Sequence, residues 1–400
     1  MGAITFFSSL EKFLRSVINA IFYFWVATLV GKESFGLLVV MLAALSFFTP
    51  LLAGGLETYS VAKFINVTDQ DKLRCQMQEI GTLLCIYSFI FLSVTLGIYK
   101  YNQVPIFLLL VMSVPFVLSR FYEVDRYWEF SRFDIRKNII IDYAGILISL
   151  FLKILVIKNQ ENVVEYLLLI IIFEMYSNSL IRLLLSKKLT RIRYKRVPKL
   201  LIGSSLMLIF SGVLQAGFSR IDLIMVPYLF DKSMAADYGF TIRIFDIFLI
   251  LSAVIAAILP GYITKQNGTE GLHSKLIKTG FKISLAIIFL VLLAKTPMDF
   301  LIDRYLEEYL SSFQKLFYLL FLLPVFSLIG SINNYVLISL DKSKLVMINA
   351  SICFVTNIVL NILLSPIFGV GGFAIATIIC SFLNSIVLPF LCLRALRVKL

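Results

Sequence analysis

The 400-residue sequence is poor in charge: Asp, Glu, Lys and Arg make up 15% of it, against about a quarter in a soluble domain. Histidine is nearly absent, since His273 is the only one, which argues against a histidine-based metal or catalytic site. The five cysteines show no metal-ligand spacing, and most lie in apolar segments, where a thiol behaves as a small hydrophobic group. We therefore expect neither a metal nor a cofactor.

The sequence also lacks the short motifs of common enzymes. A Walker-type nucleotide-binding loop is missing, which argues against ATP hydrolysis, and neither HExxH nor GxSxG occurs. No cleavable signal is expected, because residues 1–12 have no small-residue cleavage site before the first apolar block. The longest predicted external link, 295–315, is too short for a catalytic domain. The chain is therefore predicted not to be an enzyme.

What the sequence has in abundance is apolar residues, at 60%, gathered in blocks of about twenty. That is the helix length needed to cross a hydrocarbon core of about 30 Å. The blocks predict an all-α, polytopic membrane protein with about twelve transmembrane helices. The second and seventh blocks exceed the bilayer thickness and should tilt or extend into water as helix. The expected spans are 13–30, 36–60, 79–98, 104–121, 138–157, 163–185, 199–230, 236–262, 277–294, 316–340, 344–365 and 370–393.

Basic residues are distributed unevenly over the links between the blocks. With the amino terminus inside, about 25 lie in cytoplasmic segments and about seven lie opposite. The positive-inside rule thus predicts an inner-membrane protein with both termini cytoplasmic, and it accounts for the net charge of +13 without nucleic acid. The link 120–137 mixes basic and aromatic residues, which we interpret as an anchor for lipid head groups.

The most basic link, 186–199, divides the chain near its middle. Gly36 and Gly239 stand in similar local sequences at the starts of the second and eighth spans, which favours two six-helix repeats. The expected domains are an amino-terminal six-helix lobe over 1–190 and a carboxy-terminal one over 191–400.

Polar residues recur at helical spacing inside several predicted spans. A charge at the centre of a spanning helix costs about 2.5–3.5 kcal/mol, so such residues need partners or a wet cavity. Four charged residues of spans 7 and 8 lie at similar predicted depth in the outer half of the membrane, where they can neutralise one another as a static cluster or face a common cavity. They are Arg220, Asp222, Arg243 and Asp246. For the Asn and Ser stripes of spans 11 and 12, helix packing is the competing interpretation.

Two regions carry a resemblance to a known family. The first is the segment 30–38, VGKESFGLL, and the second runs over 335–377, with Asn357, Asn361, Pro366 and a Gly-rich turn. Together with Arg220-Ile-Asp222 they resemble the polysaccharide (O-antigen, Wzx-type) flippases of the multidrug/oligosaccharidyl-lipid/polysaccharide exporter superfamily. The resemblance covers the whole chain at the level of helix layout.

The resemblance implies a two-lobed, inverted-V transporter that moves an undecaprenyl-diphosphate-linked oligosaccharide to the periplasmic leaflet by alternating access. It further implies membrane lipids, a polysaccharide polymerase and a chain-length regulator as partners. Cations would hold the diphosphate and amides the sugar hydroxyls. The implied substrate-binding residues are Arg15, Asn19, Lys153, Gln215, Arg220, Arg243, Asn334, Asn357 and Asn361. The candidates for carrying a coupling proton or sodium ion are Asp222, Asp246 and Glu174.

Other functions stay open at this point. A lipid II-type flippase differs chiefly in the head group of its substrate, and an ion-coupled multidrug exporter would favour a more acidic, aromatic cavity. An O-antigen polymerase would typically carry a large external loop, which is not expected here. A purely structural scaffold would not need opposed charges at matching depth.

Overall fold

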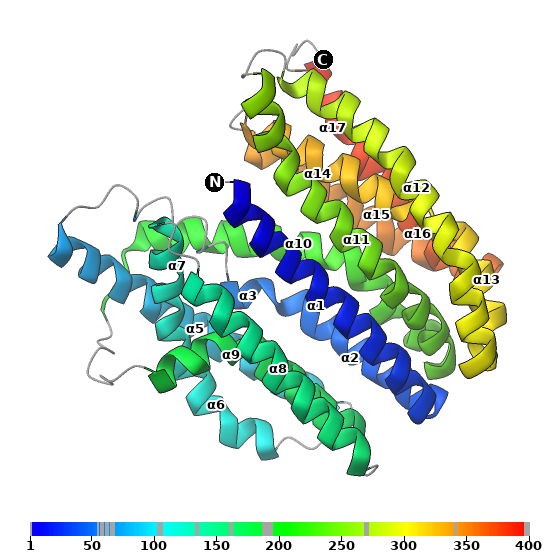
Figure 1. Ribbon diagram of the computed structural model, residues 1–400, viewed down its shortest axis with the longest axis horizontal. Coiled ribbons are helices and arrows are strands. Elements are labelled where there is room, and N and C mark those ends of the chain that lie inside the picture. The colour runs from blue at the N-terminus through cyan, green and yellow to red at the C-terminus, as the bar shows by residue number, and fades with distance from the viewer. Residues whose placement is uncertain are drawn as a thin grey trace. The chain divides into compact units, whose positions relative to one another are not determined.

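The computed structural model describes residues 2–53, 56, 60, 64, 69–101, 107–132, 136–159, 163–185, 195–267, 272–339 and 342–395 (Figure 1). Within these ranges nearly every residue is helical and none forms a strand, which confirms the all-α class. Ten helical segments of the described residues are long and apolar enough to cross a membrane, some of them made of consecutive helices, and Phe13–Leu29 of the first helix is a shorter apolar segment. The chain is thus a multi-pass membrane protein, and its helices are consistent with the expected number of about twelve spans.

The first half of the chain, to residue 185, contains eight α-helices and one 3-10 turn among its described residues. They are α1 (Gly2–Leu29), α2 (Lys32–Phe48), α3 (Pro50–Ala53), α5 (Gln70–Tyr101), α6 (Phe107–Ser119), the 3-10 turn η1 (Arg120–Tyr122), α7 (Glu123–Ser131), α8 (Arg136–Asn159) and α9 (Val163–Leu185). The described residues of the second half continue with α10 (Lys199–Leu229), α11 (Lys232–Asn267), α12 (Leu272–Tyr305), α13 (Glu307–Leu320), α14 (Leu323–Ser339), α15 (Ser343–Phe368), α16 (Val370–Phe382), the π-helical turn η3 (Leu383–Val387) and α17 (Leu388–Ala395).

The chain folds into two compact units. One comprises residues 1–40 and 217–400, and the other comprises residues 41–216. Residues 186–194, where the sequence placed the lobe boundary and most of the basic charge of that link, lie outside the described residues. The two six-helix lobes therefore stay a prediction.

The expected second span, 36–60, is interrupted. Helix α2 ends at Phe48, and the short helix α3 begins at Pro50. Proline has no N–H to donate and its ring clashes with the preceding turn, so it starts a new helix more readily than it continues one. The described part of this block is thus two consecutive helices, which together still make one candidate membrane span, Lys32–Leu52.

Two expected links are helical. Residues 120–131 form η1 and α7, while α12 continues to Tyr305 and α13 begins at Glu307, so that only Leu306 separates them. Both segments bury an apolar stripe, which in α13 includes Tyr309 and Phe313. Amphipathic periodicity continues past the point where mean hydropathy falls. The link predicted over 295–315 is thus far shorter than expected.

In the unit that comprises residues 1–40 and 217–400, α11 packs against α1, α12 and α14. The close approach of α2 to α11 requires two glycines. A Cβ on Gly36 would lie 1.9 Å from the Lys232 carbonyl oxygen, and one on Gly239 would lie 2.2 Å from Val39 Cγ1. The two glycines that the sequence singled out therefore lie at one helix–helix contact.

In the unit that comprises residues 41–216, α8 packs along α9, and α6 lies against both α5 and α9. An apolar cluster that includes Phe64, Ile80, Tyr87 and Leu201 joins segments far apart in the sequence. The Tyr87 and Ser205 hydroxyls lie 2.5 Å apart in this cluster and share a hydrogen bond. This core fixes α5 and α7, which carry the polar groups described below.

Candidate functional site

A cluster of three charges joins α10 to α11 within one unit. The Arg220 guanidinium donates to Asp246 Oδ1 at 2.8 Å, and Arg243 Nη1 lies 3.3 Å from Asp246 Oδ2. The three side chains are 13–20% exposed, so this ion triad is largely shielded. Two guanidinium groups share one carboxylate, which leaves the ion triad one net positive charge.

Arg243 also connects the ion triad to an apolar cavity of about 340 Å³ between α1, α11 and α12. Its guanidinium lies 5.1 Å from the centroid of the Tyr23 ring, a distance at which a cation is attracted to a ring face. Among the described lining residues, Arg243 is the only charged one; the others include Phe24, Phe240 and Leu301. The cavity therefore offers an apolar wall with a single cationic group.

Asp222, which the sequence placed with these three charges, lies in a separate contact set. Its side chain is 2% exposed and accepts hydrogen bonds from the Tyr238 hydroxyl at 2.5 Å and from Thr377 Oγ1 at 3.1 Å. The Leu223 N–H donates to it at 2.8 Å. Within the described part of the chain it forms no ion pair of 4.0 Å or less. Arg220 and Asp222 nevertheless interact electrostatically, so three of the four expected charges are joined by ion pairs and Asp222 acts on Arg220 at longer range.

The amides predicted on α15 form a buried pair. Asn361 Nδ2 donates to Asn357 Oδ1 at 2.7 Å, and both side chains are fully buried. Asn361 Oδ1 accepts no hydrogen bond from the residues that the structure describes. On α14, the half-buried Asn334 likewise has an unpaired Oδ1, and its neighbour Asn333 donates to the Ser385 carbonyl at 2.6 Å.

In the unit 41–216, two other candidates pair with each other. Lys153 Nζ on α8 lies 2.6 Å from Glu174 Oε2 on α9, and Ser149 Oγ donates to the same oxygen at 2.9 Å. Lys153 is 3% exposed. A buried cation with an adjacent carboxylate is neutralised in place, and this pair links two neighbouring helices.

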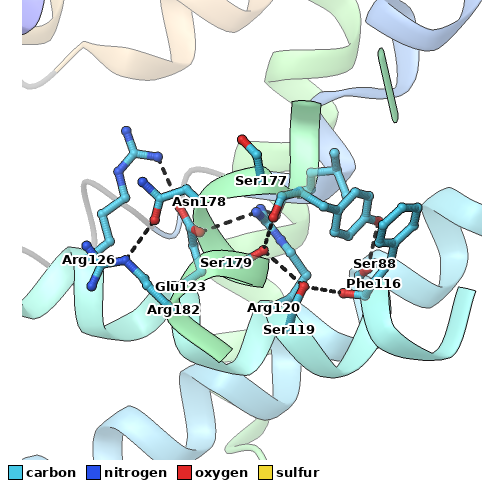
Figure 2. Close-up of polar contacts among 12 residues, drawn as sticks. Ser88, Phe116, Ser119, Arg120, Glu123, Arg126, Ser177, Asn178, Ser179 and Arg182 are labelled. Carbon is cyan, nitrogen blue, oxygen red and sulfur yellow. Dashed lines mark hydrogen bonds and ion pairs between the residues drawn. The ribbon is translucent and has the colours of Figure 1, made fainter. Parts of the chain in front are cut away.

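A larger polar network in the same unit was only partly visible in the sequence (Figure 2). Arg182 donates to Asn178 Oδ1 at 2.7 Å and pairs with Glu129 at 2.7 Å, while Asn178 donates to Asp142 at 2.5 Å. Glu129 was not among the predicted residues, because residues 120–137, which include α7, were taken for a link. Its amphipathic periodicity is the signal that could have revealed it.

Glu123, at the start of α7, is the most enclosed carboxylate of this network. Arg126 Nη1 lies 3.1 Å from it and Arg120 Nη1 lies 3.5 Å from it. Burial raises the pKa of Glu123, but the positive charges of Arg120 and Arg126 outweigh that effect and hold the pKa below its ordinary value. Glu123 is therefore ionised at neutral pH and ties α7 to its neighbours.

The remaining candidates lie elsewhere. Arg15 and Asn19 are half-buried on α1, and each interacts with other residues. Gln215 is exposed on α10 and belongs to the unit 41–216. The structure thus brings the predicted residues together in small sets, each within one unit.

Comparisons with known proteins show which solved structures share this arrangement of helices. No protein-family model matches the chain, and no curated protein matches it. An inward-facing multidrug-resistance MATE transporter of the MOP superfamily superposes with a TM-score of 0.68 at 14% identity, covering 96% of this chain and 95% of the other. The lipid II flippase MurJ, in an inward closed conformation, superposes with a TM-score of 0.62 at 17% identity, covering 98% of this chain and 86% of the other. A MOP superfamily transporter from Pyrococcus furiosus, whose binding pocket has reversed polarity, superposes with a TM-score of 0.57 at 11% identity. The match covers 99% of this chain and 96% of the other. The chain therefore has the fold of MOP superfamily transporters.

Proposed function

We propose that this protein flips an undecaprenyl-diphosphate-linked oligosaccharide, an O-antigen repeat unit, from the cytoplasmic to the periplasmic leaflet by alternating access. The observation that carries the proposal is the ion triad of Arg220, Arg243 and Asp246, whose net positive charge lies within apolar helices. Charged groups within apolar helices are costly, and in membrane proteins such groups mark ion and substrate pathways. The shared fold with transporters and a flippase supports transport over catalysis.

The chemistry of the ion triad fits an anionic head group. Guanidinium groups bind phosphate oxygens through charge-assisted, paired hydrogen bonds. Arg243 makes only one contact with Asp246, and its buried Nε has no partner among the described residues, so it has donors to spare. The apolar cavity beside Arg243 can take hydrocarbon, while amides such as Asn334 can meet sugar hydroxyls.

Of the three carboxylates considered for ion coupling, Asp222 is the one we favour. Asp246 is paired with two arginines and Glu174 with Lys153, so neither is available to a proton or cation without breaking an ion pair. Asp222 is surrounded by hydroxyl groups and a backbone N–H instead. A buried carboxylate with such neighbours can take up a proton or sodium ion during the transport cycle.

A lipid II-type flippase is the second candidate, because MurJ shares the fold over most of both chains. Its substrate would present the same diphosphate to the ion triad. A multidrug exporter is the third, on the similarity to the MATE structure, but a cationic drug would be repelled by a positively charged cluster. As an O-antigen flippase, the protein would not be an enzyme and would work beside a polymerase and a chain-length regulator in the inner membrane.

The test is complementation of bacterial strains that lack one flippase each. The gene should restore surface O-antigen in a strain without its own O-antigen flippase, and Arg220→Ala and Arg243→Ala should each lower it at least tenfold at equal protein level. Lys282→Ala, which removes an exposed cation from α12, is the matched control and should keep full activity.

The alternatives give different results in the same strains. Rescue of a strain depleted of its lipid II flippase, without rescue of O-antigen, would favour the second candidate. Normal translocation of single repeat units with failed polymerisation would indicate a polymerase. Unchanged O-antigen in both arginine variants would refute the anionic-site proposal.

A further inference from the structure

A second cavity, in the unit 41–216, lies apart from the residues proposed to bind the substrate. It measures about 540 Å³ and lies between the first turns of α5 and the short helix α7. Phe121, Tyr122 and Met77 are among its apolar lining residues. Its charged lining residues are of both signs: Arg74, Arg132 and Lys137 are basic, and Asp71, Asp125 and Glu129 are acidic. A volume of this size suits a small ligand or a lipid head group.

Two of the three cations at this cavity are not tied up in an ion pair within the described part of the chain. Arg74 and Arg132 are exposed, and neither forms an ion pair with any residue that the structure describes. Three carboxylates line the cavity, those of Asp71, Asp125 and Glu129. Glu129 is already paired with Arg182 at 2.7 Å and with Lys137 at 3.2 Å. The cavity therefore has donors available for an anion.

Arg132 is held in a defined orientation. Its guanidinium lies 4.4 Å from the centroid of the Trp128 ring, and Trp128 also lines the cavity. Stacking on the indole fixes the plane of the guanidinium and leaves its N–H groups free to bind a phosphate. Arg74 lies on α5, whereas Arg132 directly follows α7, so the two cations come from different segments.

The cavity lies where apolar helix gives way to polar residues. The first turns of α5 carry Asp71, Lys72 and Arg74, whereas residues 80–98 of the same helix carry no charge. The helix therefore passes from hydrocarbon to the interfacial layer beside this cavity, at the depth of lipid phosphates. Apolar lining residues combined with cations suit a ligand that is itself amphipathic.

We infer that this cavity binds the phosphate-bearing head group of an anionic phospholipid, with Arg74 and Arg132 holding the phosphate and Trp128 packing against the glycerol backbone. The binding needs neither the ion triad nor transport. It would hold α7, and through Glu129 also α8 and α9, at the membrane border. A soluble phosphate compound has the same anionic group but no apolar part, so the two sources can be separated by experiment.

The sequence offers a direct probe, because Trp25 and Trp128 are its only tryptophans. In the full-length Trp25→Phe protein, short-chain phosphatidylglycerol should shift the Trp128 fluorescence saturably. Phosphatidylcholine of the same chain length and sn-glycerol 3-phosphate should each need an at least tenfold higher concentration than phosphatidylglycerol to give the same shift. Arg74→Gln should weaken phosphatidylglycerol binding at least tenfold, while Lys72→Gln, an exposed cation on the same helix outside the cavity lining, should leave it unchanged.

Arg132→Gln alters the environment of Trp128 directly, so its effect is measured by native mass spectrometry of retained phosphatidylglycerol, where we expect loss of the bound lipid. Equal binding of phosphatidylcholine would overturn the role of the negative charge. Equal binding of glycerol phosphate would overturn the lipid assignment in favour of a soluble ligand. Unchanged binding in Arg74→Gln would overturn the site itself.

Discussion

At the scale of single residues, Asp246 is the group on which the ion triad depends. Its two oxygens accept from Arg220 and Arg243, and without it two guanidinium groups would face each other in a largely apolar setting. Removing one partner of a fully buried ion pair costs about 3–5 kcal/mol, and partial exposure here reduces this to about 1–3 kcal/mol. We predict that Asp246→Ala lowers the Tm of the detergent-purified protein by several degrees. Asp303→Ala, at an exposed position on α12, is the control and should change little; an equal Tm in both variants would contradict the prediction.

Glu123 is the residue expected to make the stability of the protein depend on pH. Because its pKa is lower in the folded protein than in the unfolded chain, its stabilising effect is complete above the unfolded pKa of about 4.3 and is lost as pH falls through the folded value. We predict that Glu123→Gln lowers the Tm at neutral pH and flattens the decline of the Tm below about pH 5. The measurement is thermal unfolding over a pH series, with Glu33→Gln at an exposed position as control. A variant that declines as steeply as the parent protein would show that Glu123 is not the titrating group.

Which charges would pair was only partly readable from the sequence. Helical spacing placed Arg220, Arg243 and Asp246 at one depth, and depth is what decides whether neighbouring helices can pair their charges. The separation of Asp222 depended on Tyr238 and Thr377, and Thr377 lies on a helix far along the chain. Spacing along one helix cannot specify such a partner, because the choice is made by how helices pack.

At the scale of helices, the contact of α2 with α11 depends on Gly36 and Gly239, which have no Cβ atom. We predict that Gly36→Ala destabilises the protein by about 1–3 kcal/mol, because the added Cβ would force the helices apart. Gly97→Ala on α5 is the matched control: nothing lies within 4 Å of its added Cβ, so the better helix propensity of alanine should leave stability equal or slightly higher. Chemical unfolding of both variants measures the difference, and equal effects would show that the close approach is not needed.

Helix ends were harder to predict than helix positions. Mean hydropathy falls where charged residues begin, yet α12 and α5 continue well beyond that point as amphipathic helix. Hydropathy reports the apolar environment that a segment occupies, whereas the backbone hydrogen bonds that define a helix continue into water. Proline has the opposite effect: the block around Pro50 is continuous in hydropathy, but a new helix begins at Pro50.

At the scale of the whole molecule, the sequence predicted the fold class and the approximate number of spans because both follow from local composition. The two compact units, by contrast, combine residues 1–40 with 217–400, a grouping that no local pattern contains. The fold match to transporters at 11–17% identity likewise depends on helix arrangement more than on shared residues. The substrate is therefore the part of the function that depends most on direct experiment.

The orientation of the chain in the membrane is testable on its own. The excess of basic residues in alternate links predicts that Lys72 and Lys137 face the cytoplasm, while Lys232 and Glu307 face the periplasm. All four are exposed, so single cysteines placed there in a cysteine-free background can react with a membrane-impermeant maleimide. In intact spheroplasts we expect labelling of Lys232→Cys and Glu307→Cys, and labelling of Lys72→Cys and Lys137→Cys only after the membrane is opened. Reversal of this pattern would place the ion triad nearer the cytoplasmic face and would require the proposed direction of flipping to be reconsidered, because substrate would then meet the triad from the other leaflet.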